Sequence, residues 1–327
     1  MRLAALVAAL VSTALPARAW VRSHADQGTG PCLFWSTRGH SFQIDARGTP
    51  DVPGSSAFDA VRKSFAAWAA ISCSDLSFPD LGLSSDPKDR RIGYVPGAFN
   101  RNLILWRTAN CARGGAPPGD ACLAIPGSCA NPYDCWDHGD NAIAVTTTTY
   151  NRTTGQIYDA DTEFNDSPDA NQGKFQFTTV DSGPVCTSPG QVNCRSYDVQ
   201  NTLTHEAGHS IGLDHSLDST ATMYAFSLPG DVDKRNPHPD DVQAVCTIYP
   251  RGKPTLTCVG DPITLTAGAA SDGGGCGCSQ RGNGSPLGAI LAALGILLLR
   301  RRRPCVYGLR LAAKTTDAEL AVVTRGV

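Results

Sequence analysis

The sequence predicts a single domain of the mixed α/β (α+β) class, and two kinds of pattern support that prediction. Short segments with strand-like alternation recur through the first 165 residues. Between and after them lie segments whose apolar side chains repeat at helical spacing. A domain of about 230 residues, from residue 20 to residue 252, is large enough to bury one core.

The N-terminus has the pattern of a secretory signal peptide over residues 1–19. One arginine precedes an apolar run from Leu3 to Leu15, and the small residues Ala17 and Ala19 follow as a cleavage signal before Trp20. A core helix or a membrane anchor is the alternative. The apolar run is shorter than the roughly 20 residues that span a bilayer, so cleavage and export are expected.

The first half of the domain predicts one helix among several strands. Residues 57–71 have apolar side chains at helical spacing, and this amphipathic helix is expected to pack on a sheet rather than to bind a ligand. Its apolar positions are Val61, Phe65, Trp68 and Ile71, and Ser55 or Ser56 is the expected N-cap. Strands are expected over residues 32–45, 91–95 and 103–107.

Cysteine is abundant, as expected for an exported chain in which disulfides persist. The sequence has 13 cysteines, and the even set between Cys32 and Cys258 suggests up to five disulfides whose pairing the sequence leaves open. Cys186 and Cys194 form a plausible short loop. A loop over residues 110–141 holds Cys111, Cys122, Cys129 and Cys135. This loop is expected to be tied by disulfides, and a second zinc site there is the alternative.

Two further strands are expected over residues 142–150 and 157–165, joined by a turn at Thr154-Gly155. Carboxylates recur along the second strand and just after it. They are Asp159, Asp161, Glu163 and Asp166. Hard oxygen ligands of this kind suit calcium, whereas a solvated strand face is the simpler interpretation.

Residues 205–215, HEAGHSIGLDH, contain the pattern most specific for function. On a helix that begins near Asp198, His205 and His209 lie one turn apart and face the same way, so both imidazoles can reach one metal ion. Gly212 can adopt the left-handed conformation that ends a helix and turns the chain back, which brings His215 to the same ion. Leu203, Ala207 and Ile211 are expected to be buried.

Three histidines are the ligand set of a catalytic zinc site, because a fourth position stays open for water. Glu206 lies beside the metal rather than on it, where it can take a proton from an attacking water and return it to a leaving amine. The alternative is a solvated helix that happens to carry histidines. The sequence has seven histidines, and three of them fall on the required positions together with the glutamate and the glycine.

This motif, with Met223 after it, resembles the metzincin zinc endopeptidases. The run HSLDSTATMY, in which a serine follows the third histidine and a short loop leads to the methionine, is most similar to the matrixin branch. Ala225 stands where astacin-like members have a tyrosine ligand, which argues against astacins. The resemblance covers about residues 20–250, and its specific motifs lie within residues 198–250.

The resemblance implies a twisted mixed sheet, an active-site helix and a C-terminal helical subdomain. It implies that Met223 forms an apolar floor under the zinc ligands and that residues 225–237 line the pocket for the substrate side chain after the cut bond. A final helix is expected from Pro239. The strand 157–165 resembles the edge strand that pairs antiparallel with a peptide substrate.

Two departures from the matrixin pattern concern latency and a second zinc ion. Matrixins usually have a prodomain whose cysteine blocks the zinc within a PRCGxPD motif, and no such motif precedes the domain here. They also hold a structural zinc through further histidines. The histidines outside the motif are His24, His40, His138 and His238, so a second zinc of that type is not expected.

The C-terminal part predicts a linker followed by a surface-sorting segment. Residues 253–284 are rich in Gly, Ser, Thr and Pro and end in a Cys-Gly-Cys motif at Cys276 and Cys278. Residues 285–303 combine a short apolar helix with an arginine run, which resembles C-terminal sorting signals of myxobacterial surface proteins. A permanent membrane anchor, with the arginines at the cytoplasmic face, is the alternative. Residues 304–327 fit neither reading and are left unassigned.

Together these patterns predict a zinc endopeptidase of a bacterium, secreted or displayed at the cell surface, monomeric, and acting on proteins or peptides. The 28 basic and 30 acidic residues nearly balance, so no field favours nucleic acid. Membrane contact is expected only through the C-terminal segment, transient or anchored. A surface-displayed, zinc-stabilised adhesion module without turnover is the main alternative, and a zinc hydrolase of non-peptide substrates is a second.

Overall fold

A six-stranded mixed sheet organises the fold, with the strand order β12-β7-β8-β6-β4-β5. In the computed structural model, the residues described are 19–26, 29–168, 174–179, 186, 189–190, 194–258 and 320–327. Strands β4, β5, β6 and β8 are parallel, whereas β7 is antiparallel to β8 and β12 is antiparallel to β7. The strands are β4 (Phe42–Asp45), β5 (Asp80–Ser84), β6 (Asn102–Arg107), β7 (Ala144–Asn151), β8 (Ile157–Asn165) and β12 (Leu320–Gly326). This mixed α/β architecture confirms the predicted fold class.

Short strand pairs and turns complete the fold around this sheet. Three two-stranded pairs join β1 (Val21–Arg22) to β11 (Leu213–Asp214), β2 (His24–Asp26) to β3 (Thr29–Cys32), and β9 (Gln176–Thr178) to β10 (Ser196–Asp198). Four 3₁₀ turns are η1 (Pro87–Arg90), η2 (Cys111–Arg113), η3 (Ala121–Ala124) and η4 (Asp233–Arg235). A one-turn helix, α2 (Ala130–Tyr133), lies in the cysteine-rich loop.

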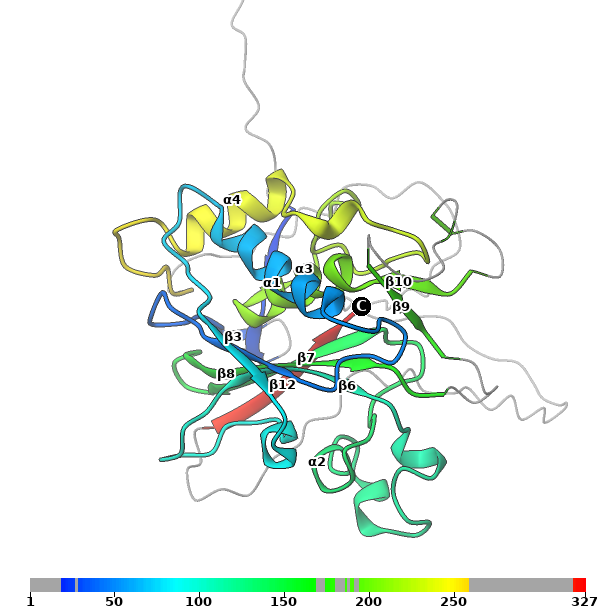
Figure 1. The fold of residues 1–327 in the computed structure, drawn as a ribbon. Helices are drawn as coiled ribbons and strands as arrows, with labels where there is room; N and C mark the ends of the chain where they lie inside the picture. Colours follow the sequence, from blue (N-terminus) through cyan, green and yellow to red (C-terminus); the bar gives the residue numbers. More distant parts are fainter. Residues whose placement is uncertain are drawn as a thin grey trace, which may run out of the picture. The chain divides into compact units, whose positions relative to one another are not determined.

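Helices α1 (Ser56–Ala69) and α3 (Val199–Ser210) cover one face of the sheet, and α4 (Pro239–Ile248) lies beyond α1 (Figure 1). The four predicted apolar positions of the first helix are all buried. The Trp68 side chain is fully buried, and its indole N–H donates to the Thr204 carbonyl of α3 at 2.8 Å. Burial of the apolar face of α1 thus also fixes the position of the helix that carries the histidine motif.

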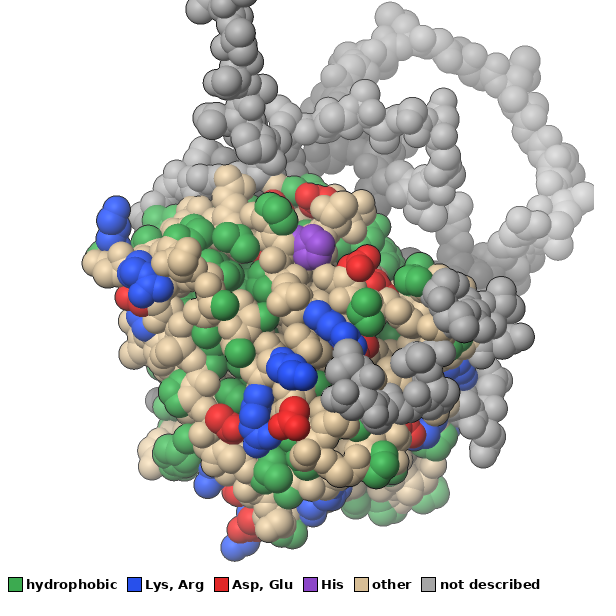
Figure 2. Space-filling model, turned by 45° about the horizontal axis from the view of Figure 1, so that its top comes forward, with side chains coloured by type: hydrophobic (Ala, Val, Ile, Leu, Met, Phe, Trp, Pro, Cys, Tyr) green, Lys and Arg blue, Asp and Glu red, His purple; other side chains and the backbone are tan. Residues whose placement is uncertain are grey.

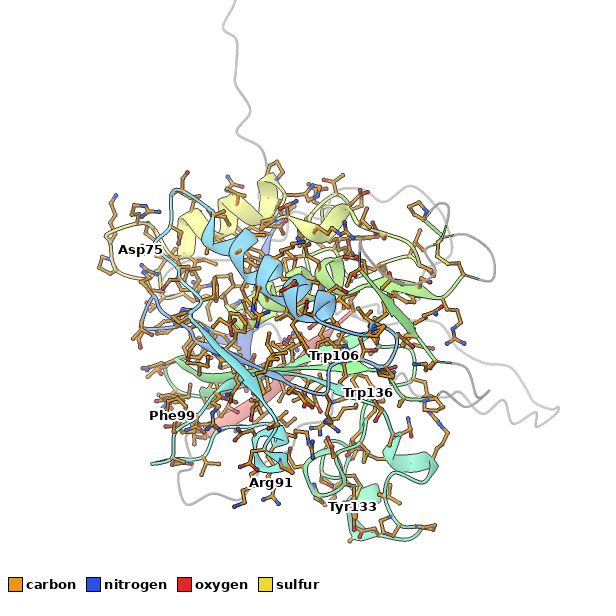
Figure 3. All side chains as sticks on the ribbon, in the orientation of Figure 1. Asp75, Arg91, Phe99, Trp106, Tyr133 and Trp136 are labelled. Carbon is orange, nitrogen blue, oxygen red and sulfur yellow. A yellow bond between two sulfur atoms is a disulfide. The ribbon has the colours of Figure 1, made fainter. Side chains whose placement is uncertain are left out.

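Trp106 of β6 marks the core between α1 and the sheet, where its ring stacks on Phe164 at 5.0 Å (Figure 3). Arg91 and Phe99 lie at the periphery, away from this core (Figure 3). The strand predicted over residues 91–95 is wrong, since these residues form an irregular segment. Its backbone N–H groups at Ile92 and Gly93 bond to side chains of other segments, and Gly93 has a φ of 96°.

The strand predicted over residues 32–45 is only partly correct. Regular strand structure occupies Phe42–Asp45, and Cys32 ends β3. Between them the chain makes isolated pairings to different partners, such as Leu33 with Ser23 and Phe34 with Gly155. The other predicted strands are confirmed within two residues, and Gly155 makes the expected turn with a φ of 79°.

The strand predicted as the sheet edge is not the edge. Strand β8 is paired on both sides, with β6 and with β7. Of the strands β4 to β8, β7 is therefore the outermost on this side of the sheet, and only the C-terminal strand β12 lies beyond it. The edge prediction rested on the resemblance of this segment to the edge strand of metzincins, and a solvated face was the simpler interpretation of its alternating carboxylates. Here the side chains of Asp159, Asp161 and Glu163 are at most 1% exposed, so the solvated-face interpretation is wrong.

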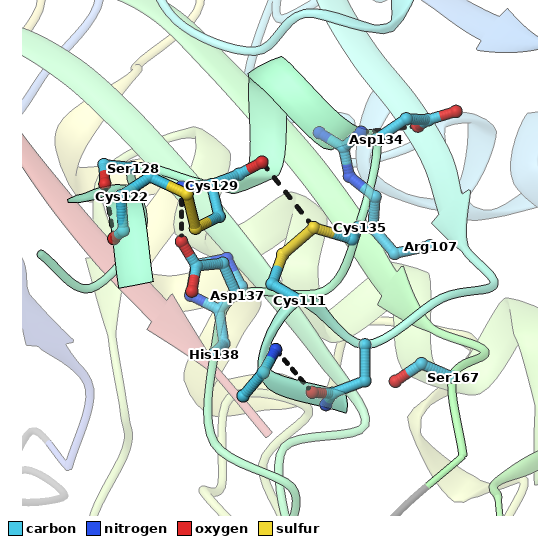
Figure 4. The surroundings of a disulfide bond; sticks show 12 residues. Arg107, Cys111, Cys122, Ser128, Cys129, Asp134, Cys135, Asp137, His138 and Ser167 are labelled. Atoms are coloured by element: carbon cyan, nitrogen blue, oxygen red, sulfur yellow. Dashed lines mark hydrogen bonds and ion pairs between the residues drawn. A yellow bond between two sulfur atoms is a disulfide. The ribbon is translucent and has the colours of Figure 1, made fainter. Parts of the chain in front are cut away.

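Ten cysteines form five disulfides, as the even count predicted, and the pair Cys186–Cys194 is among them. The other pairs are Cys32–Cys258, Cys73–Cys246, Cys111–Cys135 and Cys122–Cys129. The last two hold the long loop together, where Cys129 N–H also donates to Asp137 (Figure 4). The alternative of a zinc site in this loop is therefore wrong.

Charged side chains of both signs are interspersed on the face shown in Figure 2, in keeping with the near balance of charge. Within the described residues, no helix combines the length and the apolar character needed to cross a membrane. The predicted signal peptide up to residue 18, the Cys-Gly-Cys motif and the sorting segment 285–303 lie outside the described residues. The predicted linker begins at residue 253, and its first residues are tied to the domain by the Cys32–Cys258 disulfide and by Arg22 bonding Leu256.

Candidate metal centre

Helix α3 presents the first two predicted metal ligands to the interior. It begins as expected after Asp198, whose carboxylate accepts the Asn201 N–H at 2.7 Å and also pairs with Arg235. This cap satisfies one of the free N–H groups of the first turn. Leu203, Ala207 and Ile211 are fully buried, as predicted, so their packing sets the rotation of the helix about its axis.

His205, His209 and His215 converge, with their ligand atoms within 4.8 Å of one another. Nδ1 of His205 lies 2.7 Å from the Thr222 carbonyl, and Nδ1 of His209 lies 2.9 Å from the Leu213 carbonyl. A carbonyl only accepts, so in both rings Nδ1 carries the proton and Nε2 keeps its lone pair. The two Nε2 atoms are 3.2 Å apart.

Gly212 delivers the third histidine as predicted. Its φ of 86° lies in the left-handed region, and a Cβ there would overlap the Leu33 carbonyl oxygen. Its N–H bonds the His209 carbonyl at 3.0 Å, which closes the helix and turns the chain into β11. The His215 ring then lies 5.3 Å from that of His205 and 4.9 Å from that of His209, between ring centroids.

The three imidazoles fit a zinc ion. Burial lowers the pKa of His205 well below its ordinary value, the pKa of His209 to about 3, and also the pKa of His215, so all three are neutral and able to bind a cation. Nε2 of His215 is buried and has no hydrogen-bond partner. Nitrogen ligands at 2.0–2.1 Å from a tetrahedral zinc are about 3.4 Å apart, close to the observed His205–His209 separation.

Glu206 lies beside this cluster and is fully buried. The Thr146 hydroxyl of β7 donates to its Oε2 at 2.8 Å, and the Val327 N–H donates to its Oε1 at 3.3 Å. Burial raises the pKa of Glu206 to about 8. A carboxyl group with a pKa near neutrality can both accept and return a proton, which is what a general base and acid requires.

Met223 lies beneath α3 as the resemblance implied, with 1% of its surface exposed. It faces Gly208, where an added Cβ would overlap the Met223 sulfur and contact Trp68. The Ser216 N–H donates to the Met223 carbonyl at 2.8 Å, which ties the third ligand's strand to the methionine turn. Gly208 is a support residue that the sequence reasoning missed, although its place between His205 and His209 on the inner helix face could have indicated close packing.

Asp241 is a second missed residue, and it holds the methionine turn in place. Its buried carboxylate accepts the N–H groups of Thr222 at 2.7 Å, His238 at 2.9 Å and Met223 at 3.1 Å. The Thr222 carbonyl orients His205, so Asp241 acts on the ligand through one intervening residue. The sequence predicted only the start of the final helix in this region, which the structure confirms at Pro239.

Lys234 is a buried cation close to the cluster. It lies in η4, within the loop predicted to line the substrate pocket, and its ammonium group donates to the Tyr224 carbonyl. Burial lowers the pKa of Lys234 to about 8, and its charge contributes to the lowered pKa of His205. A lysine at this position was not singled out from the sequence because nothing in its spacing marks it as buried.

Asp159, Asp161 and Glu163 alternate with Thr162 along β8 and therefore lie on the other face of the sheet from Thr146 and Glu206. Burial alone would raise the pKa of Glu163, but Arg107 and His138 hold it at about 2. Asp166 bonds Lys174 and Thr49. Among the described residues these carboxylates do not form a group of three converging metal ligands, and calcium binding stays a prediction.

Asp159 and Asp161 share a hydrogen bond and no described basic partner offsets their charge. Burial, together with the charge of Asp161, raises the pKa of Asp159 to about 10, and burial raises that of Asp161 to about 6. Both values exceed the ~3.9 of an unfolded aspartate, so the folded state binds more protons. The stabilising contribution of this pair is therefore fully present below about pH 4 and is lost as the pH rises through the folded pKa values.

We expect Asp159→Asn to raise the Tm in calcium-free buffer at pH 7 by several degrees, because the amide keeps a donor for Asp161 and, unlike the carboxyl group, does not have to take up a proton on folding. Thermal unfolding between pH 4 and pH 8 checks this, and the variant is expected to lose less stability over that range than the wild type. Asp59→Asn, at an exposed position in α1, serves as the control and should change the Tm little. A lower Tm for Asp159→Asn would contradict the prediction.

A second group of potential ligands, His24, Cys32 and Cys258, is held by a disulfide instead. Cys32 and Cys258 are bonded to each other, and Nε2 of His24 lies 3.8 Å from the Cys32 sulfur. A disulfide sulfur lacks the thiolate charge that binds zinc. Among the described residues, the other histidines outside the motif do not belong to a converging ligand group, and His138 bonds Glu163.

Comparison with known proteins shows which family the part of the chain around the centre resembles. The sequence profile of the matrixin family matches residues 130–250. A "Probable matrix metalloproteinase 095L" of Invertebrate iridescent virus 3 is 41% identical over 51 residues, covering 16% of this chain and 13% of the viral protein. Interstitial collagenase of Aquarana catesbeiana is 35% identical over 77 residues, covering 23% and 19%. Metalloendoproteinase 1 of Glycine max is 37% identical over 70 residues, covering 21% and 22%.

These relatives match only locally, since the chain spans less than a quarter of the length of each. The family match nevertheless contains every predicted residue of the centre. It includes His205, His209, His215, Glu206, Gly212 and Met223. The chain is therefore matrixin-like, and residues 130–250 are the part that shows it.

Proposed function

We propose that this protein is a zinc-dependent endopeptidase that hydrolyses peptide bonds of proteins outside the cell. The observation that carries the proposal is the arrangement of three neutral, buried imidazoles beside a buried carboxyl group. His205, His209 and His215 would hold the zinc through Nε2. The bound ion supplies a Lewis acid that polarises the peptide carbonyl and acidifies a water.

The protein residues handle the proton and the orientation. Glu206 accepts a proton from the attacking water and returns it to the leaving amine, with its carboxyl positioned by the Thr146 hydroxyl. The Thr222 and Leu213 carbonyls hold two ligand rings in one tautomer. Met223 and Gly208 close the floor beneath these rings and exclude water.

The substrate class follows from the sheet. Strand β7 lies next to α3 and carries Thr146, so an extended peptide paired with β7 would pass its main chain over the centre. This requires an unfolded or extended protein segment rather than a small ester. Export by the signal peptide, a monomeric state, membrane contact through residues 285–303 and a bacterial cell-surface location are parts of the same proposal, as is the absence of a nucleic-acid partner.

Two other functions make different predictions. A zinc-stabilised adhesion module would bind one zinc and cut nothing, but such a module does not need a buried glutamate beside the metal. A hydrolase of non-peptide substrates would act on small esters or amides without proteolysis. The buried Glu206 and the extended strand β7 favour the endopeptidase.

Incubation of the protein with a reduced and alkylated substrate protein tests the proposal. Mass spectrometry is expected to find new internal termini, whose formation stops when zinc is removed with a chelator. A small ester assayed in parallel should be hydrolysed no faster than in buffer. Zinc bound without any new termini, in the wild type and in the tail variants described below, would contradict the proposal.

A further inference from the structure

The last described residues of the chain pair with the strand that a substrate is expected to use. Strand β12 runs antiparallel along β7, from Leu320 opposite Asn151 to Gly326 opposite Val145. It lies at the outer position of the sheet, and its C-terminal end reaches α3 (Figure 1). Residues 320–327 belong to the same compact unit as the described residues from 19 to 258. An added antiparallel strand at this edge has the polarity expected of a peptide substrate.

The end of this strand enters the metal centre itself. The Val327 N–H donates to Oε1 of Glu206 at 3.3 Å, and the Val327 carbonyl accepts the Ile143 N–H at 2.7 Å. The main chain of Gly326 interacts with the ring of His215. The proton acceptor and the third metal ligand are thus both contacted by the tail.

Side chains make the fit specific to this segment. Arg325 donates to Asp214, the residue before His215, at 3.1 Å. Ala321 is buried and packs, with Val323 beside it, in a cluster that contains Leu33 and Tyr150 of the domain. An alternation of small apolar residues facing inward is what pairing on a half-buried edge requires.

Gly326 permits the closest approach of the tail to β7. A Cβ at this position would overlap the Ala144 carbonyl oxygen and the Val145 side chain. The Ala144 oxygen belongs to the backbone of β7 and cannot move aside. A larger residue at position 326 would therefore displace the tail from β7, while the sequence of the domain stays unchanged.

We propose that residues 320–327 are an autoinhibitory strand that occupies the peptide-binding edge of the enzyme and covers Glu206. This rests on the proposed endopeptidase function. The tail is tethered to the domain, so its effective concentration at β7 is on the order of millimolar, and a free substrate competes poorly. The tail would supply a form of latency that does not depend on a prodomain cysteine.

The proposal also has a consequence for the membrane hypotheses. A tail that docks on β7 lies on the same side of the membrane as the catalytic residues. The permanent-anchor alternative puts the residues after Arg303 on the cytoplasmic side of an exported protein, where they could not reach β7. Cleavage between Cys258 and Leu320 would turn the tail into a peptide that dissociates on dilution.

Three full-length proteins test the tail. Val322→Pro/Val323→Pro places proline at neighbouring positions, so one of them removes an N–H that faces β7. Gly326→Val introduces the backbone overlap. Ala312→Pro/Ala313→Pro introduces the same pair of prolines outside β12 and is the control. Each is assayed on the same reduced and alkylated protein, with a synthetic peptide of residues 320–327 added in trans.

Both β12 variants are expected to cleave about 10- to 100-fold faster than the wild type and the control, and the peptide should inhibit them competitively. A peptide carrying Gly326→Val should inhibit far less. Amide hydrogen exchange over residues 143–151 gives a readout besides activity, and it should be faster in the β12 variants.

Equal cleavage by the wild type and the β12 variants, with no inhibition by the peptide, would overturn the tail proposal and leave the endopeptidase standing. Faster exchange at β7 without cleavage by any of the proteins would mean that the tail docks and that the endopeptidase function is wrong. Unchanged exchange at β7 would show that the tail is not docked.

Discussion

Glu206→Gln is expected to lower kcat/KM on an unfolded protein by about 10²- to 10⁴-fold, the range that a general base contributes. Glutamine has nearly the same shape and can still accept the Thr146 hydroxyl, so the fold and the three imidazoles should be unchanged. The zinc content should therefore stay at that of the wild type. Steady-state kinetics and metal analysis on the same sample check both parts.

Thr146→Val is the companion variant, because it removes the hydroxyl and keeps the carboxyl of Glu206. Its effect on the rate should be smaller than that of Glu206→Gln. It should also move the acidic limb of the pH–rate profile to higher pH, because the Thr146 hydroxyl lowers the pKa of Glu206 and its removal lets that pKa rise. Activity of Glu206→Gln within about tenfold of the wild type would mean that another group takes the proton.

Asp241→Ala is expected to have the second large effect, this time on stability and metal affinity together. Three backbone N–H groups lose their buried acceptor, each at about 1–3 kcal/mol, so the free energy of unfolding should fall by roughly 3–5 kcal/mol. The Thr222 carbonyl then no longer holds the His205 ring. Zinc affinity should fall about 10- to 100-fold, the usual cost of losing such support.

Gln243→Ala, at an exposed position in the same helix, is the matched control and should change neither quantity by more than about 0.5 kcal/mol. Denaturant unfolding of the metal-free protein separates the stability effect from the metal effect. Asp241→Ala with wild-type stability would show that the methionine turn holds its shape without the carboxylate.

The residues predicted from the sequence are those whose role depends on local spacing. His205 and His209 meet because a helix turn separates them, and Gly212 must turn the chain wherever the sheet lies. The burial of Leu203 and Ile211 follows from the same periodicity. These features depend on the helix and its end, and not on the fold around them.

The residues that sequence reasoning missed depend on distant contacts. Asp241 acts on Thr222 only because α4 packs near the methionine turn, and Gly208 is constrained only by the position of Met223. Strand β8 was taken for an edge from a local resemblance and its alternating carboxylates for a solvated face, whereas Arg107 and a protonated Asp159 let these carboxylates be buried. Alternation alone does not distinguish a solvated face from a compensated interior one.

The role of the tail depends most strongly on a contact between distant parts of the chain. Residues 320–327 are separated from β7 by more than half of the chain, and they follow a segment interpreted as a sorting signal. Their apolar, β-branched composition is consistent with a strand but does not identify its partner. Only the three-dimensional arrangement joins Val327 to Glu206.

Titration of metal-free Gly326→Val protein with zinc, with cleavage of an unfolded protein followed at each point, tests the central claim most directly. We expect no cleavage without metal, a rate that rises with bound zinc, and a plateau at one zinc per chain. Saturation at one zinc with no cleavage of the unfolded protein would contradict the assignment of the three histidines and Glu206 to an endopeptidase.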